Sequence, residues 1–127
     1  MGSVDFVVLY VKDLAASKKF YAGLFGCEPR DLSPTFSQFK MDSGLALELA
    51  RIDTVDPPSA AGGGGMEFGW PVEDEAALWR TFEDWKSMGV VIAQEPKEQV
   101  YGLSLLGLDP DGHRIRVFVP KLPQNKG

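Results

Sequence analysis

The spacing of hydrophobic residues changes character near the start of the chain. Val4–Val11 is dominated by β-branched, aromatic and aliphatic residues, a composition typical of a strand. From Leu14 onward the apolar residues recur every three or four positions, which predicts an amphipathic helix with Asp13 as its N-cap. We expect the helix to end at Phe25, because the following Gly26 can enter the left-handed backbone region without a steric penalty.

Three further strands are predicted before the middle of the chain. The apolar runs place them at Cys27–Leu32, Phe36–Met41 and Leu45–Ala50, and the sequence Asp42-Ser43-Gly44 favours a hairpin turn between the last two. Residues 52–65 then break the pattern with adjacent prolines and a run of glycines. This composition predicts a flexible linker.

After the linker the first pattern returns. A strand is expected at 66–72, and a helix from the N-cap Asp74 to Gly89. Three strands are expected at 90–93, 103–108 and 113–119, with a tight turn at 109–112.

The order strand, helix and three strands thus occurs twice, which indicates an internal duplication. One shift of the sequence superimposes Phe6 on Glu67 and Asp13 on Asp74, and a second superimposes Glu48 on Arg116. A single βαβββ unit would leave one sheet face uncovered. We therefore expect one α+β domain over residues 1–127, in which units of about 4–51 and 66–120 pair in space.

Composition narrows the possible partners. The chain of 127 residues has a net charge of −5, and its acidic residues are scattered along the sequence. Because the chain lacks a basic stripe that could neutralise phosphates, we do not expect nucleic acid as a partner. Apolar runs are too short for a membrane span, and the first residues do not resemble a cleavable leader. We expect a cytoplasmic protein with no membrane partner.

Single cysteine and histidine residues limit the chemistry further. Cys27 allows neither an internal disulfide nor a cysteine-based metal cluster, and we expect it to be a small buried residue at the start of a strand. His113 follows the turn glycine and differs in strand parity from Arg116, so we expect a surface or turn position. Nucleophilic hydrolysis that needs a histidine base is therefore disfavoured. The glycine run 62–65 lacks the residues of a phosphate-binding loop.

Two segments resemble signatures of a known superfamily. Both segments are similar to recurring motifs of the vicinal oxygen chelate superfamily. The first consists of Val8–Leu14 followed by Phe20-Tyr21 and Leu24–Gly26, and the second is Asp109–Ile115. That group includes glyoxalase I, extradiol dioxygenases, fosfomycin-resistance enzymes and bleomycin-binding proteins. The resemblance covers nearly the whole chain. It implies the glyoxalase/bleomycin-resistance/dioxygenase fold, with a curved sheet around a cavity, and a homodimer.

The resemblance also identifies four positions that hold a divalent metal in the enzymes of that superfamily. They correspond here to Phe6, Glu48, Glu67 and Arg116. Phenylalanine cannot bind a metal, and arginine opposes a cation. Two carboxylates could retain only a weak, labile ion, since transition metals generally need imidazole or thiolate as well. We expect no cofactor, and we expect Arg116 to replace the ion by pairing with Glu48 or Glu67.

Strand alternation predicts the lining of the cavity. The expected ligand-binding residues are Phe6, Tyr10, Gln38, Glu48, Glu67, Tyr101, Arg116 and Phe118. Such a lining suits a planar, mostly apolar ligand. Alternatives remain open at this point: the aromatic residues Phe6 and Tyr10 could be plain core, and Glu48 and Arg116 could be a buried ion pair that satisfies itself. Trp79 and Trp85 are expected to be packing or interface residues.

Three functions are compatible with this sequence. The first is metal-independent binding or sequestration of a small aromatic molecule without catalysis, as the resemblance to bleomycin- and phenazine-resistance proteins implies. The second is a glyoxalase-like lyase, isomerase or dioxygenase whose ion is held by Glu48 and Glu67. The third is an assembly module with no ligand. A stoichiometric transition metal that survives dialysis would favour the second.

Overall fold

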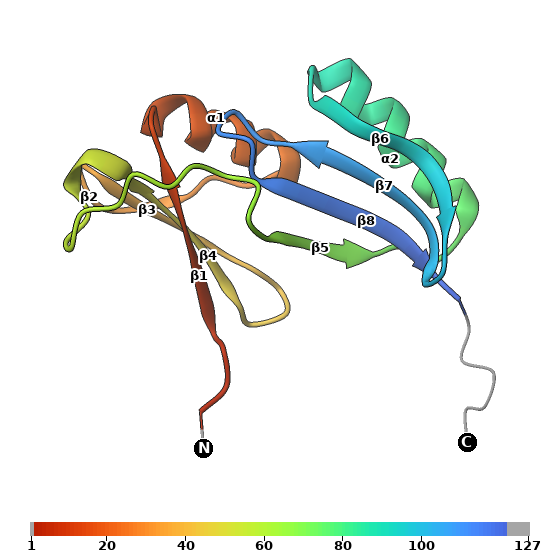
Figure 1. The fold of residues 1–127 in the computed structure, drawn as a ribbon, viewed down its shortest axis with the longest axis horizontal. Helices are drawn as coiled ribbons and strands as arrows, with labels where there is room; N and C mark the ends of the chain where they lie inside the picture. The colour runs from red at the N-terminus through yellow and green to blue at the C-terminus, as the bar shows by residue number, and fades with distance from the viewer. Residues whose placement is uncertain (1, 122–127) are drawn as a thin grey trace. The chain divides into compact units, whose positions relative to one another are not determined.

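The computed structural model describes residues 2–121 of the protein, and the chain divides into two compact units between Gly63 and Gly64. Each unit carries one helix and one open, four-stranded mixed sheet, which confirms the α+β class and the βαβββ order (Figure 1). Within residues 2–121, neither helix has both the length and the apolar character needed to span a membrane.

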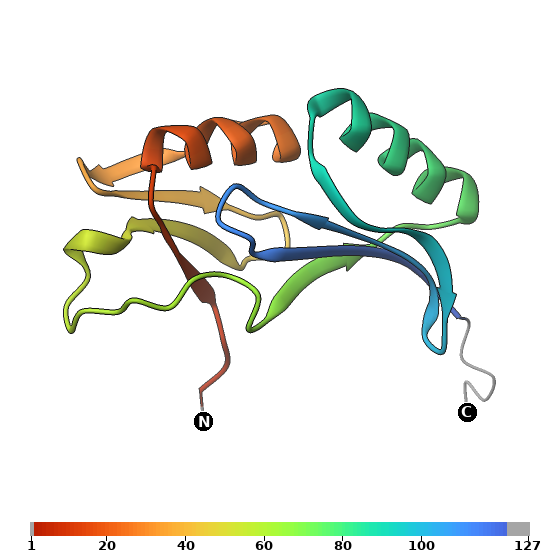
Figure 2. The ribbon, with the colours of Figure 1, turned by 45° about the horizontal axis from the view of Figure 1, so that its top comes forward.

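The first unit contains five regular elements and one short 3-10 helix. They are β1 (Phe6–Val11), α1 (Leu14–Phe25), β2 (Arg30–Ser33), β3 (Phe36–Lys40), β4 (Ala46–Arg51) and η1 (Ile52–Thr54). The sheet order is β1-β4-β3-β2, in which β1 runs parallel to β4 while the other pairs are antiparallel. Helix α1 lies along one face of this sheet (Figure 2).

The expected ends of α1 are confirmed. The Asp13 carboxylate accepts a hydrogen bond from the backbone N–H of Ala16 at 3.0 Å, and Gly26 adopts a left-handed conformation with φ of 69°. Alternation along β1 then decides what the helix covers: Leu9 and Val11 are buried, whereas Phe6 and Tyr10 point to the other side. Tyr21 and Phe39 are fully buried and complete this core, 6.3 Å apart between ring centroids.

The second unit repeats the arrangement. Its elements are β5 (Glu67–Pro71), α2 (Glu75–Met88), β6 (Val91–Gln99), β7 (Gly102–Leu108) and β8 (Arg114–Pro120). The sheet order is β5-β8-β7-β6, with β5 parallel to β8. Asp74 caps α2 through the N–H of Ala77 at 2.8 Å, as expected, and Gly89 ends it with φ of 79°. The core between α2 and the sheet consists of buried apolar residues, including Leu78, Phe82, Trp85, Leu105, Ile115 and Val117.

Strand register supports the duplication residue by residue. In the first unit Phe6 lies opposite Ala46 and Val8 opposite Glu48. In the second unit Glu67 lies opposite Arg114 and Gly69 opposite Arg116, the positions that the two sequence shifts relate to those of the first unit. Phe6 and Glu67 are therefore equivalent, as are Glu48 and Arg116.

Several expectations about single elements were wrong. Strand β2 begins at Arg30 rather than Cys27, because Pro29 has no backbone N–H to donate to a strand ladder. Cys27 therefore lies outside the strand and is exposed instead of buried. Strand β6 continues to Gln99, well past the expected end at Ala93. Pro96 is accommodated because β6 is an edge strand whose pairing with β7 shifts register between Gln94 and Lys97.

His113 is buried, with 8% of its surface exposed, rather than a surface residue. Its Nδ1 lies 2.8 Å from Oδ2 of Asp109, and the other carboxylate oxygen of Asp109 accepts the backbone N–H groups of Asp111 and His113. The carboxylate thus organises the tight turn, which closes with a bond from the N–H of Gly112 to the carbonyl of Asp109. This contact gives the histidine a structural role at the turn.

Candidate functional site

An arginine–glutamate pair lies on the face of the second sheet that α2 does not cover. Arg116 on β8 donates from Nε to Oε2 of Glu67 on β5 at 2.6 Å, and from Nη2 to Oε1 at 3.0 Å. The two residues are diagonal neighbours, since Arg116 lies opposite Gly69 and Glu67 opposite Arg114. Two parallel charge-assisted bonds of this kind fix the guanidinium in one plane.

Electrostatics of the pair follow from this geometry. The hydrogen bonds from Arg116 hold the pKa of Glu67 below its ordinary value, and the same contact raises the pKa of Arg116. Both groups therefore remain charged around neutral pH. The expected pairing of Arg116 with one of two glutamates is confirmed for Glu67.

Glycine at position 69 lets β5 approach β8 beside this pair. A Cβ atom built on Gly69 would lie 1.7 Å from the backbone oxygen of Arg116, far inside van der Waals contact. Any side chain at Gly69 would therefore push the two strands apart. The glycine thus maintains the strand spacing on which the Arg116–Glu67 bonds depend.

A hydroxyl group and an aromatic pair complete the surroundings of Arg116. Nη1 of Arg116 donates to Oγ of the fully buried Ser104 at 2.8 Å, and the Tyr101 hydroxyl lies 3.3 Å from the same Oγ. The guanidinium carbon lies 5.8 Å from the centre of the Tyr101 ring, which meets Phe118 edge to face at 5.8 Å. Four of the predicted residues thus form one contact network: Glu67, Tyr101, Arg116 and Phe118.

A hollow of about 620 Å³ opens beside this network. It is lined by Gly64, Ala93, Gln94, Gln99, Tyr101, Leu106, Leu108, Gly112, Arg114 and Arg116. We call it the β6–β8 pocket, after the strands that supply most of its walls. Its polar groups include the side chains of Gln94 and Gln99, joined by a 3.0 Å bond from Nε2 of Gln99 to Oε1 of Gln94.

The remaining predicted residues lie in the first unit. Nε2 of Gln38 donates to Oε2 of the buried Glu48 at 2.7 Å across β3 and β4. Tyr10 lines a separate hollow of about 450 Å³ together with Val8, Ser33, Thr35, Phe36, Ala50, Thr54, Val55 and Asp56. The alternative that Phe6 and Tyr10 are core residues is wrong, since 56% and 37% of their surfaces are exposed.

Four polar side chains at the β6–β8 pocket and its network were not among the predicted site residues. Ser104 and Arg114 share strand-face parity with Arg116 and could have been found by alternation. Gln94 and Gln99 were missed because β6 was expected to end at Ala93.

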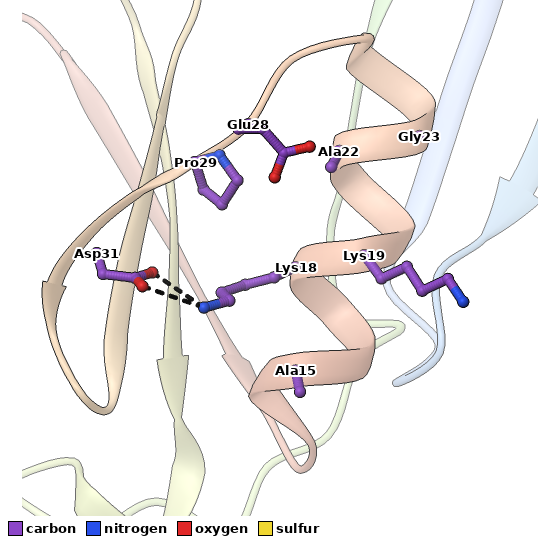
Figure 3. Close-up of a pocket in the computed structure, with 8 residues that line it drawn as sticks. All are labelled: Ala15, Lys18, Lys19, Ala22, Gly23, Glu28, Pro29 and Asp31. Carbon is purple, nitrogen blue, oxygen red and sulfur yellow. Dashed lines mark hydrogen bonds and ion pairs between the residues drawn. The ribbon is translucent and has the colours of Figure 1, made fainter.

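A third hollow, of about 630 Å³, lies between α1 and the segment that leads into β2 (Figure 3). Nζ of Lys18 points across it to Asp31 and lies 3.0 Å from Oδ1 (Figure 3). Bonds from Ser37 and Lys18 hold the pKa of Asp31 below its ordinary value. The charges at its centre are thus already paired, and the contact fastens β2 to the helix.

The donor set does not fit a divalent metal at the four positions named by the resemblance. Both Glu67 oxygens already accept bonds from Arg116, and Glu48 accepts a bond from Gln38. Phe6 has no ligating atom, and Arg116 brings a positive charge. In residues 2–121, no three His, Cys, Asp or Glu side chains gather as metal ligands would.

Comparison with known proteins places this site in context. Residues 3–117 match the family model of the Glyoxalase/Bleomycin resistance protein/Dioxygenase superfamily. The phenazine antibiotic resistance protein EhpR of Enterobacter agglomerans is 32% identical over 113 residues, which cover 87% of this chain and 86% of that protein.

Solved structures show the same fold. Protein ATC0852 from Agrobacterium tumefaciens is 40% identical with a TM-score of 0.87, and the match covers 95% of this chain and 99% of that one. A glyoxalase-related enzyme from Fulvimarina pelagi, 22% identical, has a TM-score of 0.82 over 94% of this chain and 88% of that one. At that identity the second likeness concerns the fold alone.

Proposed function

The chain belongs to the Glyoxalase/Bleomycin resistance protein/Dioxygenase superfamily, and from this premise we propose that it binds and sequesters a small aromatic molecule without a metal ion. Its similarity to the phenazine resistance protein supports a resistance-like role. The proposed ligand is planar, in keeping with the compound class in that relative's name.

The observation that carries the proposal is the arrangement of Arg116. In a metal-dependent member of the superfamily the resemblance implies a carboxylate at this position, whereas here a guanidinium binds Glu67 through two hydrogen bonds. The positive charge that a metal would supply is thus covalently part of the chain. Binding in the adjacent pocket then needs no ion to neutralise Glu67.

The β6–β8 pocket offers both aromatic and aliphatic side chains to a planar ring. Tyr101, with 39% of its surface exposed, offers an aromatic face that Phe118 supports edge to face. Leu106 and Leu108 add apolar surface. Ligand sites in proteins mostly have volumes of about 300–1,000 Å³ and combine apolar walls with a few polar groups that orient the ligand. In the β6–β8 pocket the side chains of Gln94 and Gln99 can serve as these orienting groups.

A thermal-shift titration with phenazine tests the proposal. Binding to the native state alone must raise the unfolding temperature, by an amount that grows with ligand concentration. We expect such a rise for the parent and an affinity lower by about fivefold or more for Tyr101→Ala, which removes the stacking surface.

The matched control is Tyr10→Ala, which removes the same side chain from the hollow of the first unit. A loss of affinity in Tyr10→Ala alone would move the ligand to that hollow. If phenazine and related planar compounds leave the unfolding temperature of the parent unchanged, the proposed function is wrong.

A further inference from the structure

The two arginines of the β6–β8 pocket differ in how their donors are used. Arg116 is engaged through Nε, Nη1 and Nη2, with Glu67 and Ser104 as acceptors. The Arg114 side chain donates no hydrogen bond from Nε to any residue in 2–121, and Oε1 of Glu67 lies 3.8 Å from that Nε. At 3.8 Å the contact is electrostatic and is too long for a hydrogen bond.

Arg114 is nevertheless partly enclosed. Its Nε atom is buried without a hydrogen-bond partner, the one such side-chain nitrogen or oxygen in the described part of the chain. The side chain as a whole keeps 43% of its surface exposed and lines the pocket. Leaving a buried donor unsatisfied destabilises the native state, so the position of Arg114 costs stability. A guanidinium held in this way has its outer nitrogens available to an incoming acceptor.

Charge around the pocket points to the sign of that acceptor. Two arginines line the pocket, and one glutamate, already bound to Arg116, lies next to them. One positive charge is therefore left over, in a chain whose net charge is −5. A local excess of this sign in an acidic protein favours a negatively charged ligand over a neutral or cationic one.

We infer that the ligand carries a carboxylate on its aromatic body, and that Arg114 receives this group while Tyr101 stacks against the ring. This inference rests on the proposed function, since it names the chemical class of the molecule that the β6–β8 pocket binds. A planar guanidinium can donate two parallel bonds to one carboxylate, a geometry that lysine does not reproduce.

The test compares two probes that differ in charge but hardly in shape, phenazine-1-carboxylate and phenazine-1-carboxamide. Calorimetric titration at pH 7.5, where the carboxyl group is ionised, gives the dissociation constant of each for the parent and for Arg114→Gln. We expect the parent to prefer the carboxylate, and Arg114→Gln to lose about tenfold or more in carboxylate affinity while its carboxamide affinity stays the same. Arg80→Gln removes the same charge from exposed α2 and should behave as the parent.

Stability separates this role from a structural one. Because Nε of Arg114 has no hydrogen-bond partner, Arg114→Gln should unfold at the same temperature as the parent or higher. Equal affinity of the parent for both probes, or an unchanged preference in Arg114→Gln, overturns the inference while the proposed function stands. Failure of both probes to bind the parent overturns the proposed function as well.

Discussion

Replacing Arg116 by methionine removes the group that neutralises Glu67. The substitution keeps an unbranched apolar stem but removes the guanidinium, whose carbon lies 5.8 Å from the centre of the Tyr101 ring. It deletes two bonds to Glu67 and one to the buried Ser104. The carboxylate of Glu67 then remains next to the sheet with only Arg114 nearby, at 3.8 Å.

The magnitude follows from the exposure of the partners. The Arg116 side chain is 14% exposed, which alone would suggest a loss of about 3 kcal/mol for a buried charged network. Glu67 is 40% exposed, so water replaces part of the lost interaction. We expect Arg116→Met to lower the free energy of unfolding by about 1–2 kcal/mol, and the unfolding temperature by roughly 3–10 °C.

Urea denaturation at several pH values is the appropriate assay. Arg116 lowers the pKa of Glu67 in the native state, so its contribution is complete above the ordinary pKa of 4.5 and is lost as the pH falls through the lowered value. The gap between parent and variant should therefore be constant near pH 7 and shrink below pH 4.5. The pKa of Glu67, followed by NMR, should rise in the variant.

The matched control is Arg51→Met. Arg51 donates from Nε to Asp53 at 2.7 Å, but both side chains are well exposed, at 42% and 66%. This variant should lie within about 0.5 kcal/mol of the parent. Equal losses in the two variants, or a loss in Arg116→Met that does not change between pH 7 and pH 3.5, would refute the reasoning about the pair.

Three further predictions concern the strand spacing, a helix cap and the oligomeric state. Gly69→Ala should destabilise the second unit by more than about 2 kcal/mol in urea denaturation, because its Cβ would meet the Arg116 backbone at 1.7 Å, whereas Gly65→Ala, with open space around it, should be tolerated. Asp74→Ala should cost about 1 kcal/mol of thermal stability through loss of the α2 cap, and Asp84→Ala on the exposed face of that helix should not. Light scattering should give the mass of a homodimer, as the family resemblance implies, and a monomer across the micromolar range would contradict it.

Most of the fold could be predicted from local sequence. Helix caps, helix ends and the order of the elements all depend on residues that are neighbours in the sequence. The structure confirms the N-caps Asp13 and Asp74, the helix ends at Gly26 and Gly89, and the repeated element order. The missed part of β6 depends on an edge position in the sheet, where a bulge accommodates Pro96. A sequence pattern gives no signal for that position.

Strand alternation predicts which sheet face each side chain of the candidate site occupies, but not which side chains on that face contact one another. Alternation placed Glu67 and Arg116 on one face, and the structure joins them. It could not decide which glutamate pairs with Arg116, because that depends on the diagonal offset between β5 and β8. The expected turn position of His113 is confirmed, but its burial was not predicted, because it depends on the contact between the ring and the carboxylate of Asp109 four residues earlier.

Calorimetric titration of phenazine-1-carboxylate into metal-free protein tests the central claim most directly. The protein is first dialysed against a chelator, and the titration is repeated after addition of zinc or nickel. We predict binding in the chelated sample with a dissociation constant that added metal leaves unchanged, because Arg116 already supplies the charge that balances Glu67. Binding that appears only when metal is restored would contradict the claim and assign the site to a metal-dependent member of the superfamily.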